Sequence, residues 1–284
     1  MDAFVSCEER DEESNGSGEM NKTGISWTDL TWNPVSGCSK VSPGCQNCYA
    51  EAWSKRWHRS FDVKLHPEKL KEVRKIPTGS KVFVNSMSDL FHEKVLFPRN
   101  QNLLNFELSR PFAFLTATFM AMEKRPDVTF QILTKRPENV LQFWLSLVGK
   151  YGAQHIERWA ASHWKHIFIG TSVEMRFYAE KRIPTLRSIP IFRKFISFEP
   201  LLGDIGTVNL SGIDWIIIGG ESGPHHRPMQ IEWARNLVRQ AKDQGVAVWM
   251  KQLGGLRPGG DLEDFPEDLR IREFPTVLNC DTEV

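Results

Sequence analysis

The stretch TFQILTKRP, Thr129 to Pro137, sets the pattern from which the fold of this chain can be predicted. A short run of aromatic and aliphatic residues ends abruptly in Thr134, Lys135 and Arg136, and a proline follows. A continuous apolar run of this length is typical of a strand that is buried on both faces, as in a parallel sheet. Because proline is well tolerated in the first turn of a helix, the stretch predicts a strand that leads directly into a helix.

The same order of residues recurs on both sides of this stretch. Five further runs begin apolar and end polar: KVFVNSMSDL from Lys81, HIFIGTSVE from His166, FRKFISFEP from Phe192, DWIIIGGESG from Asp214 and VAVWMKQLGG from Val246. The intervals between them have room for helices, and NVLQFWLSLVGKY and EWARNLVRQAKDQG show roughly helical apolar spacing. Alternating strands and helices predict a parallel α/β architecture, either a partial or complete (β/α) barrel or an open doubly wound sheet.

The polar ends of these runs are the first candidates for a functional site. In parallel α/β folds the active site lies at the carboxyl ends of the strands. Strands also end in polar loops without any function, so each position taken alone is open to either interpretation. The polar strand ends are Ser86, Ser88, Asp89, Thr134, Lys135, Arg136, Thr171, Ser172, Glu174, Glu199, Glu221, Ser222, Lys251 and Gln252.

A cysteine cluster follows the expected first strand. The stretch NPVSGCSKVSPGCQNCYAEAW holds Cys38, Cys45 and Cys48, three of the chain's five cysteines, in the spacing C-x6-C-x2-C. The Cys45–Cys48 pair is close enough in sequence to hold one metal centre. CYAEAWSKRW predicts a helix that begins near Cys48, and a helix N-terminus stabilises a thiolate.

Several chemistries compete for these three thiols. A structural zinc site uses four ligands, usually in two separated pairs, and no fourth ligand stands at a standard spacing here. A redox C-x2-C pair does not need Cys38. Unrelated buried cysteines rarely cluster among glycine, proline and polar residues. The remaining hypothesis is a [4Fe–4S] cluster held by three cysteines, which leaves one iron open to another ligand.

Composition limits the classes of function. The 284 residues carry a formal net charge of +1, so the overall charge does not support binding to nucleic acid or to an anionic membrane. No run approaches the ~20 apolar residues of a membrane span. The acidic N-terminus is unlike a signal peptide, and we expect a cytoplasmic protein. We expect a disordered acidic tail at 1–22, one domain at 23–256 and a C-terminal extension at 257–284.

Ten tryptophans stand out in a chain of this length. We interpret most of them as core or helix-packing residues, because their spacing in the sequence does not indicate a stacking platform. This interpretation includes Trp53, Trp57, Trp144, Trp159 and Trp164.

The cysteine stretch resembles the cluster-binding loop of radical S-adenosylmethionine (radical SAM) enzymes, especially the spore photoproduct lyase-like branch. The whole chain is also similar to a phage-type family of unknown function with the same three-cysteine motif. That similarity covers about Gly24 to Leu256. It is carried by GISWTDLTWNPVSGC, FQILTKRPENV, GGESGPHHRPM and KQLGG.

The resemblance implies an enzyme with a (β/α) barrel of radical SAM type. It implies that Cys38, Cys45 and Cys48 hold a [4Fe–4S] cluster, that S-adenosylmethionine binds the open iron, and that an electron donor protein reduces the cluster. Cleavage of the cofactor would give a radical that abstracts hydrogen from the substrate. By the same resemblance, cofactor contacts fall on the residues Ser88, Asp89, Lys135, Ser172, Glu174 and Glu199. Their positions in the sequence, and not the resemblance, make Glu221, Arg227 and Lys251 the candidates for substrate contacts.

Three features depart from the radical SAM pattern. Asn47 stands before the last cysteine, where an aromatic residue is common, and the first gap between cysteines has three extra residues. The Gly219–Gly220–Glu221 motif follows a late strand instead of the second one. Two other hypotheses stay open at this stage. One is a non-enzymatic zinc- or cluster-stabilised module that binds phage or host proteins, and the other is an enzyme whose substrate is nucleic acid.

Overall fold

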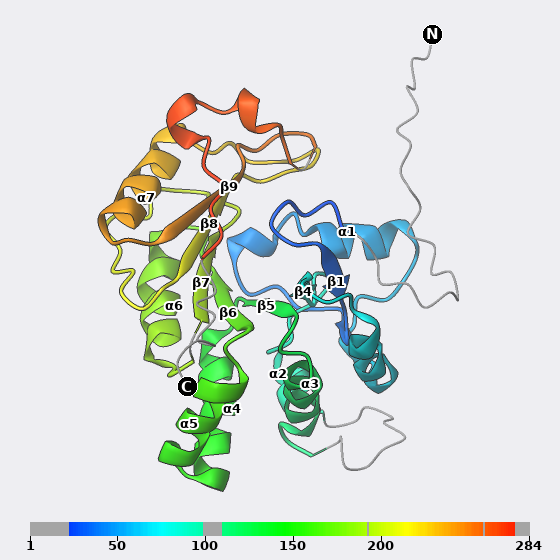
Figure 1. Ribbon diagram of the computed structural model, residues 1–284. Coiled ribbons are helices and arrows are strands. Elements are labelled where there is room, and N and C mark those ends of the chain that lie inside the picture. Colours follow the sequence, from blue (N-terminus) through cyan, green and yellow to red (C-terminus); the bar gives the residue numbers. More distant parts are fainter. Residues whose placement is uncertain (1–22, 99–109, 192, 258, 276–284) are drawn as a thin grey trace.

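The computed structural model describes residues 23–98, 110–191, 193–257 and 259–275. The acidic tail expected at 1–22 lies outside these residues. Within them the structure is a mixed α/β fold built on one curled sheet and a small two-stranded sheet (Figure 1). No helix in the described part of the chain has the length and apolar character needed to cross a membrane.

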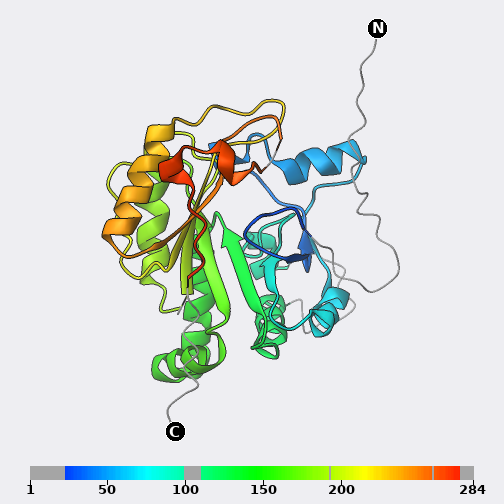
Figure 2. The ribbon, with the colours of Figure 1, turned by 45° about the horizontal axis from the view of Figure 1, so that its top comes forward.

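The main sheet has seven strands, and all neighbouring strands are parallel. Its order follows the chain: β1 (Leu30–Trp32), β4 (Lys81–Val84), β5 (Thr129–Thr134), β6 (Ile167–Ser172), β7 (Arg193–Phe198), β8 (Trp215–Gly219) and β9 (Ala247–Gln252). The sheet curls without closing, which makes it a half-barrel and confirms the predicted partial (β/α) barrel (Figure 2). The small sheet pairs β2 (Val35–Ser36) with β3 (Lys64–Leu65) in antiparallel register.

Helices connect the strands on the outer, convex side of the sheet (Figures 1 and 2). They are α2 (Glu93–Leu96), α3 (Ala113–Glu123), α4 (Pro137–Tyr151), α5 (Ala153–His163), α6 (Arg176–Ser188) and α7 (Ile231–Asp243). The remaining helix, α1 (Tyr49–Arg56), lies apart from this layer (Figure 1). Short 3₁₀ helices lie at Pro43–Cys45, Pro67–Lys75, Leu262–Asp264 and Glu267–Leu269. Pro137 occupies the first turn of α4, as the sequence predicted.

The two faces of the sheet have different cores. On the convex face, Ile132, Ile169, Ile196 and Ile216 belong to the large apolar core that the helices complete. The concave face holds a smaller and mostly aromatic cluster: Trp27, Phe83, Phe168, Phe195, Trp215 and Ile217. These side chains fill the base of the half-barrel together with the buried Gln131, whose amide donates to the Trp27 carbonyl at 3.3 Å.

The described part of the C-terminal extension packs against β9. The Met250 N–H donates to the carbonyl of Ile271 at 2.8 Å, and the Glu273 N–H donates to the carbonyl of Val248 at 2.8 Å. Leu269 is fully buried. This segment therefore protects the edge of β9, which would otherwise expose a row of unpaired backbone groups.

Candidate functional site

The three cysteines lie on a single loop between β2 and α1, beside the carboxyl ends of the strands. Cys38, Cys45 and Cys48 are free thiols, and each is half-buried. Cys45 ends the 3₁₀ turn at Pro43–Cys45, and Cys48 is the N-cap of α1, as the sequence predicted. Gly37 has a φ of +77° and lies so close to the backbone of Asp62 that an added Cβ would be 2.2 Å from its carbonyl oxygen. Glycine is therefore required immediately before Cys38.

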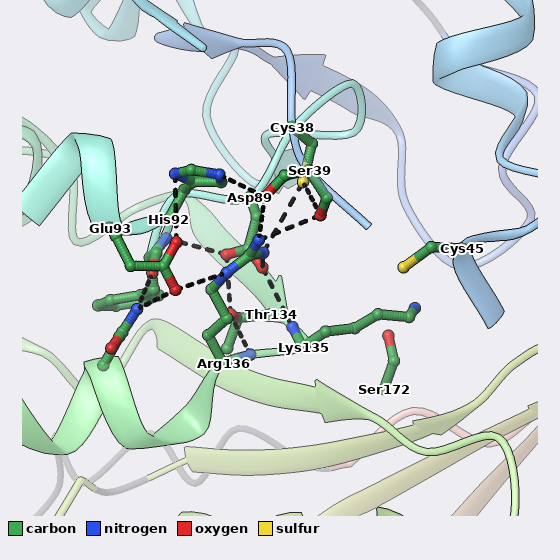
Figure 3. A network of polar contacts seen from close by, with 12 residues as sticks. Cys38, Ser39, Cys45, Asp89, His92, Glu93, Thr134, Lys135, Arg136 and Ser172 are labelled. Carbon is green, nitrogen blue, oxygen red and sulfur yellow. Dashed lines mark hydrogen bonds and ion pairs between the residues drawn. The ribbon is translucent and has the colours of Figure 1, made fainter. Parts of the chain in front are cut away.

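A buried arginine holds the first part of this loop. The Arg136 guanidinium donates to Asp89 at 2.9 Å, to Glu93 at 3.1 Å and to the carbonyl of Ser39 at 3.1 Å (Figure 3). It also contacts the Cys38 sulfur at 3.8 Å. Only 2% of its surface is exposed. Arg136 thus joins the ends of β4 and β5 to the cysteine loop.

Asp89 is fully engaged by this network. Besides Arg136, its carboxylate accepts from the Thr134 hydroxyl at 2.8 Å and from the backbone N–H groups of Phe91 and Lys135. A buried carboxylate needs this number of donors to offset its lost hydration. The neighbouring Ser88 hydroxyl donates to the Val35 carbonyl at 2.8 Å, just ahead of the cysteine loop. Both side chains anchor the loop in this structure, and a direct cofactor contact for either remains a prediction.

The same network sets the protonation of Cys38. Burial, with the nearby Asp89 carboxylate, raises the pKa of the Cys38 thiol to about 11, although Arg136 acts in the opposite direction. The thiol of the metal-free chain is therefore protonated at neutral pH. A metal that binds there has to displace the proton, and Arg136 then faces a thiolate.

A second carboxylate, Glu174, holds the middle of the loop from the end of β6. It is completely buried; one of its oxygens accepts from the Ser42 hydroxyl, and the other from Arg182 at 2.9 Å. A Cβ added at Gly44 would be 2.4 to 2.8 Å from the Glu174 side chain. Gly44 therefore allows the loop to approach this carboxylate closely.

A third carboxylate, Glu221, holds the last part of the loop from the end of β8. It accepts from the Asn47 amide at 3.0 Å and from the Arg227 guanidinium and N–H group. Burial raises the pKa of Glu221, but these hydrogen bonds outweigh that effect, and the net change is a lowered pKa. Arg227 also reaches the Pro43 carbonyl at 3.1 Å, so residues 221–227 clasp the cysteine loop.

The glycines before Glu221 have a structural reason. A Cβ added at Gly220 would be 2.3 Å from the carbonyl oxygen of Leu253. Gly220 therefore lets the chain after β8 pass directly against the chain after β9. Close packing thus explains Gly220, and the contact with Asn47 gives Glu221 its role, whereas an added Cβ at Gly219 would make only ordinary contacts, the nearest at 3.4 Å.

The three carboxylates form one arrangement. Asp89, Glu174 and Glu221 follow β4, β6 and β8, so every second strand in this part of the sheet contributes one. They hold successive parts of the loop: Asp89 through Arg136 at Ser39, Glu174 at Ser42 and Glu221 at Asn47. The loop is therefore built into the strand ends before any ligand binds.

The remaining candidates line the polar end of the half-barrel's interior. Lys135 extends away from Arg136 toward Cys45 and Ser172 (Figure 3), and its ammonium is 3.8 Å from Glu174. Lys251 and Glu199, from the ends of β9 and β7, form an ion pair that is about one-fifth exposed. Beneath them the buried Ser197 hydroxyl has no hydrogen-bond partner within the described chain. This orphaned group indicates room for a water molecule or a ligand atom.

The loop offers three free thiols as possible metal or cluster ligands. Across the described ranges, no three His, Cys, Asp or Glu side chains meet closely enough to hold one ion. In a cubane cluster each thiolate binds a different iron, so the sulfurs stand further apart than the ligands of one ion. The loop holds three free thiols, and a thiol is the ligand type that such a cluster uses.

Comparison with known proteins gives a family for this chain. The chain belongs to a family of proteins of unknown function (DUF5131). The DUF5131 model matches residues 22–264, which include the cysteine loop and all seven strands of the main sheet. No curated protein and no solved structure shows a significant match.

Sequence reasoning found most of the residues that the structure brings together at this end of the DUF5131 chain. It placed Arg136 among the polar strand ends without giving it a role, and it did not select Ser39, Ser42 or Asn47 as residues that join the loop to the strand ends. A charged residue at the junction of a buried strand and a proline was the available signal for Arg136. Of the tryptophans interpreted as packing residues, Trp144 and Trp164 are buried, whereas Trp53, Trp57 and Trp159 are 38%, 53% and 39% exposed.

Proposed function

We propose that this DUF5131 protein is an iron–sulfur enzyme of radical SAM type and a distant relative of the spore photoproduct lyase-like branch. The observation that carries the proposal is the loop with three free thiols, held by carboxylates from three strand ends beside the open end of a parallel half-barrel. Thiolates are the usual ligands of iron–sulfur clusters. The carboxyl end of such a sheet is also where active sites lie.

In this proposal Cys38, Cys45 and Cys48 would hold a [4Fe–4S] cluster that works together with S-adenosylmethionine. When it is bound and reduced, such a cluster supplies the electron that breaks a sulfur–carbon bond of S-adenosylmethionine and yields a 5′-deoxyadenosyl radical. An electron donor protein is required for that reduction. A reducing cytoplasm suits the three free thiols.

The chain's own residues have separate tasks in this scheme. Lys135 carries an ammonium beside the loop, where it would pair with the carboxylate of S-adenosylmethionine. Glu199 and Lys251 offer opposite charges on the far side of the interior, where a polar substrate or the ribose would contact them. The aromatic residues below exclude water from the base of the half-barrel, which protects a reactive species.

Iron analysis with matched cysteine variants tests the proposal. After anaerobic reconstitution we expect about four irons and acid-labile sulfide per chain. Cys45→Ala should lose most of the iron, whereas Cys280→Ala, outside the described residues, should keep it. Addition of S-adenosylmethionine should change the spectrum of the reduced cluster, and 5′-deoxyadenosine should form. Zinc without sulfide would reject the proposal and favour a metal-stabilised interaction module.

A further inference from the structure

The helix that follows the cysteine loop exposes a row of aromatic rings. Tyr49, Trp53 and Trp57 stand at i, i+4 and i+8 of α1 and its C-cap, so they lie along one face of the helix. Their exposed fractions are 59%, 38% and 53%. Only Ala50 and Ser54 of α1 are buried, so the helix is attached through a narrow face of small residues. Several large exposed rings in one row are typical of an interaction site.

Basic groups accompany this row. The Arg59 guanidinium lies 5.1 Å from the centre of the Trp53 ring, and that of Arg56 lies 6.0 Å from the centre of the Trp57 ring. The sequence has no carboxylate between Glu51 and Asp62. The neutral overall charge thus conceals a local concentration of positive charge. We call Tyr49, Trp53, Trp57, Arg56 and Arg59 the α1 strip.

A second exposed row of rings, on α5, differs from the α1 strip. There the ring of Trp159 stacks on that of His163 with centres 4.1 Å apart, and its indole N–H donates to Glu123. Those rings are already stacked on one another and stand beside a carboxylate. In the α1 strip, the rings of Trp53 and Trp57 are tilted by 55° with centres 6.5 Å apart, and they have guanidinium groups beside them.

We propose that the α1 strip binds single-stranded nucleic acid. Unpaired bases stack on aromatic side chains without regard to sequence, and arginines beside the rings neutralise phosphates. Bases in a duplex are stacked on each other, so rings on a protein surface select single strands. The strip contains no aliphatic side chain, which argues against an apolar partner helix. An α-helix rises 1.5 Å per residue, so Tyr49 to Trp57 spans about 12 Å, enough for about three stacked nucleotides.

The α1 strip lies next to the cysteine loop. The strip begins at Tyr49, directly after Cys48, and the Tyr49 hydroxyl donates to the Ser86 carbonyl just beyond β4. A bound strand would therefore run from the outer end of α1 toward the cysteine loop. That a nucleotide is the substrate rests on the proposed function, whereas binding to the strip does not depend on it.

The test measures binding of fluorescein-labelled 20-nucleotide poly(dT) and poly(U) to the full-length protein as purified, by fluorescence anisotropy at several salt concentrations. We expect a Kd that weakens as salt rises. Stacking is worth about 1–3 kcal/mol per base, so Trp53→Ala/Trp57→Ala should weaken binding by about tenfold or more. Trp53→Phe/Trp57→Phe, which keeps the rings, should lose much less. Arg56→Gln/Arg59→Gln should reduce the slope of log affinity against log salt concentration by about 1.4, because each lost phosphate contact accounts for ~0.7 on a single strand.

Trp159→Ala is the matched control, because it removes an equally exposed tryptophan far from the loop and should leave binding unchanged. Equal binding by the wild type and the double alanine variant, with unchanged thermal unfolding, would overturn the inference. So would binding to anionic phosphatidylserine vesicles with no affinity for either oligonucleotide. Iron content is recorded for each sample. A cluster-bearing chain without affinity for the oligonucleotides removes this inference alone, and an oligonucleotide-binding chain that cannot take up iron removes the proposed function alone.

Discussion

Replacing Arg136 with methionine should cause one of the largest losses of stability that a single substitution can produce at this end of the sheet. Methionine fills similar space but removes the hydrogen bonds that the Arg136 guanidinium donates to Asp89, Glu93 and Ser39. Glu93 is 58% exposed on its side chain and regains water, whereas Asp89 is 7% exposed and does not. The energetic cost therefore falls mainly on Asp89.

The magnitude follows from that burial. Removal of one partner from a buried ion pair costs about 3–5 kcal/mol. Asp89 keeps three other donors: the Thr134 hydroxyl and the backbone N–H groups of Phe91 and Lys135. We therefore expect the lower end, about 3 kcal/mol, which for a chain of this size lowers the Tm by about 6 °C or more.

The assay is urea and thermal unfolding of the metal-free protein, with a double-mutant cycle. Asp89→Asn removes the charge that Arg136 neutralises, so the Arg136→Met/Asp89→Asn double variant should lose less than the sum of the single variants. Arg176→Met is the control, because that exposed arginine pairs only with Glu180 one helical turn away and contributes well under 1 kcal/mol. A loss below about 1 kcal/mol for Arg136→Met, with an additive cycle, would refute the assignment of Arg136 as the anchor of the loop.

Three further predictions concern the loop and the rest of the barrel. Gly44→Ala should destabilise the protein and lower iron uptake, because the new methyl group would overlap the buried Glu174 carboxylate. The control is Gly149→Ala, on an open face of α4, which should add about 0.5–1 kcal/mol to the free energy of unfolding. Glu221→Gln should weaken the hold on the loop and speed iron loss to a chelator as much as Arg227→Met does. If only Arg227→Met speeds iron loss, the Glu221 carboxylate is not the anchor. Burial lowers the pKa of His166 in the folded protein below its usual 6.5. At a pH between the folded-state and unfolded-state pKa of His166, the unfolded chain binds a proton that the folded chain does not. The free energy of unfolding should therefore fall as the pH drops below about 6.5. His166→Gln should flatten that part of the stability-versus-pH profile, and an unchanged profile would contradict this account.

The sequence alone was enough to predict that the cysteine loop lies beside the strand ends. Apolar runs that end in polar residues are visible because a strand buried on both faces must be apolar along its length. The cysteine spacing and the helix that starts at Cys48 are equally local, and the structure has both. The sequence therefore predicts that the polar strand ends lie at one edge of a parallel sheet.

The sequence by itself determined the parallel α/β architecture and the presence of three thiols on one loop, because both follow from neighbours in the chain. That the sheet curls into a half-barrel was one of several arrangements that the sequence left open. Only the tertiary structure decided which side chains hold that loop. Ser42 and Glu174 are 132 positions apart, and Asn47 and Glu221 are 174 apart. Such pairs meet because each strand curls a little further around the barrel than the one before it. That accumulated rotation is a property of the whole sheet, and no short stretch of sequence encodes it.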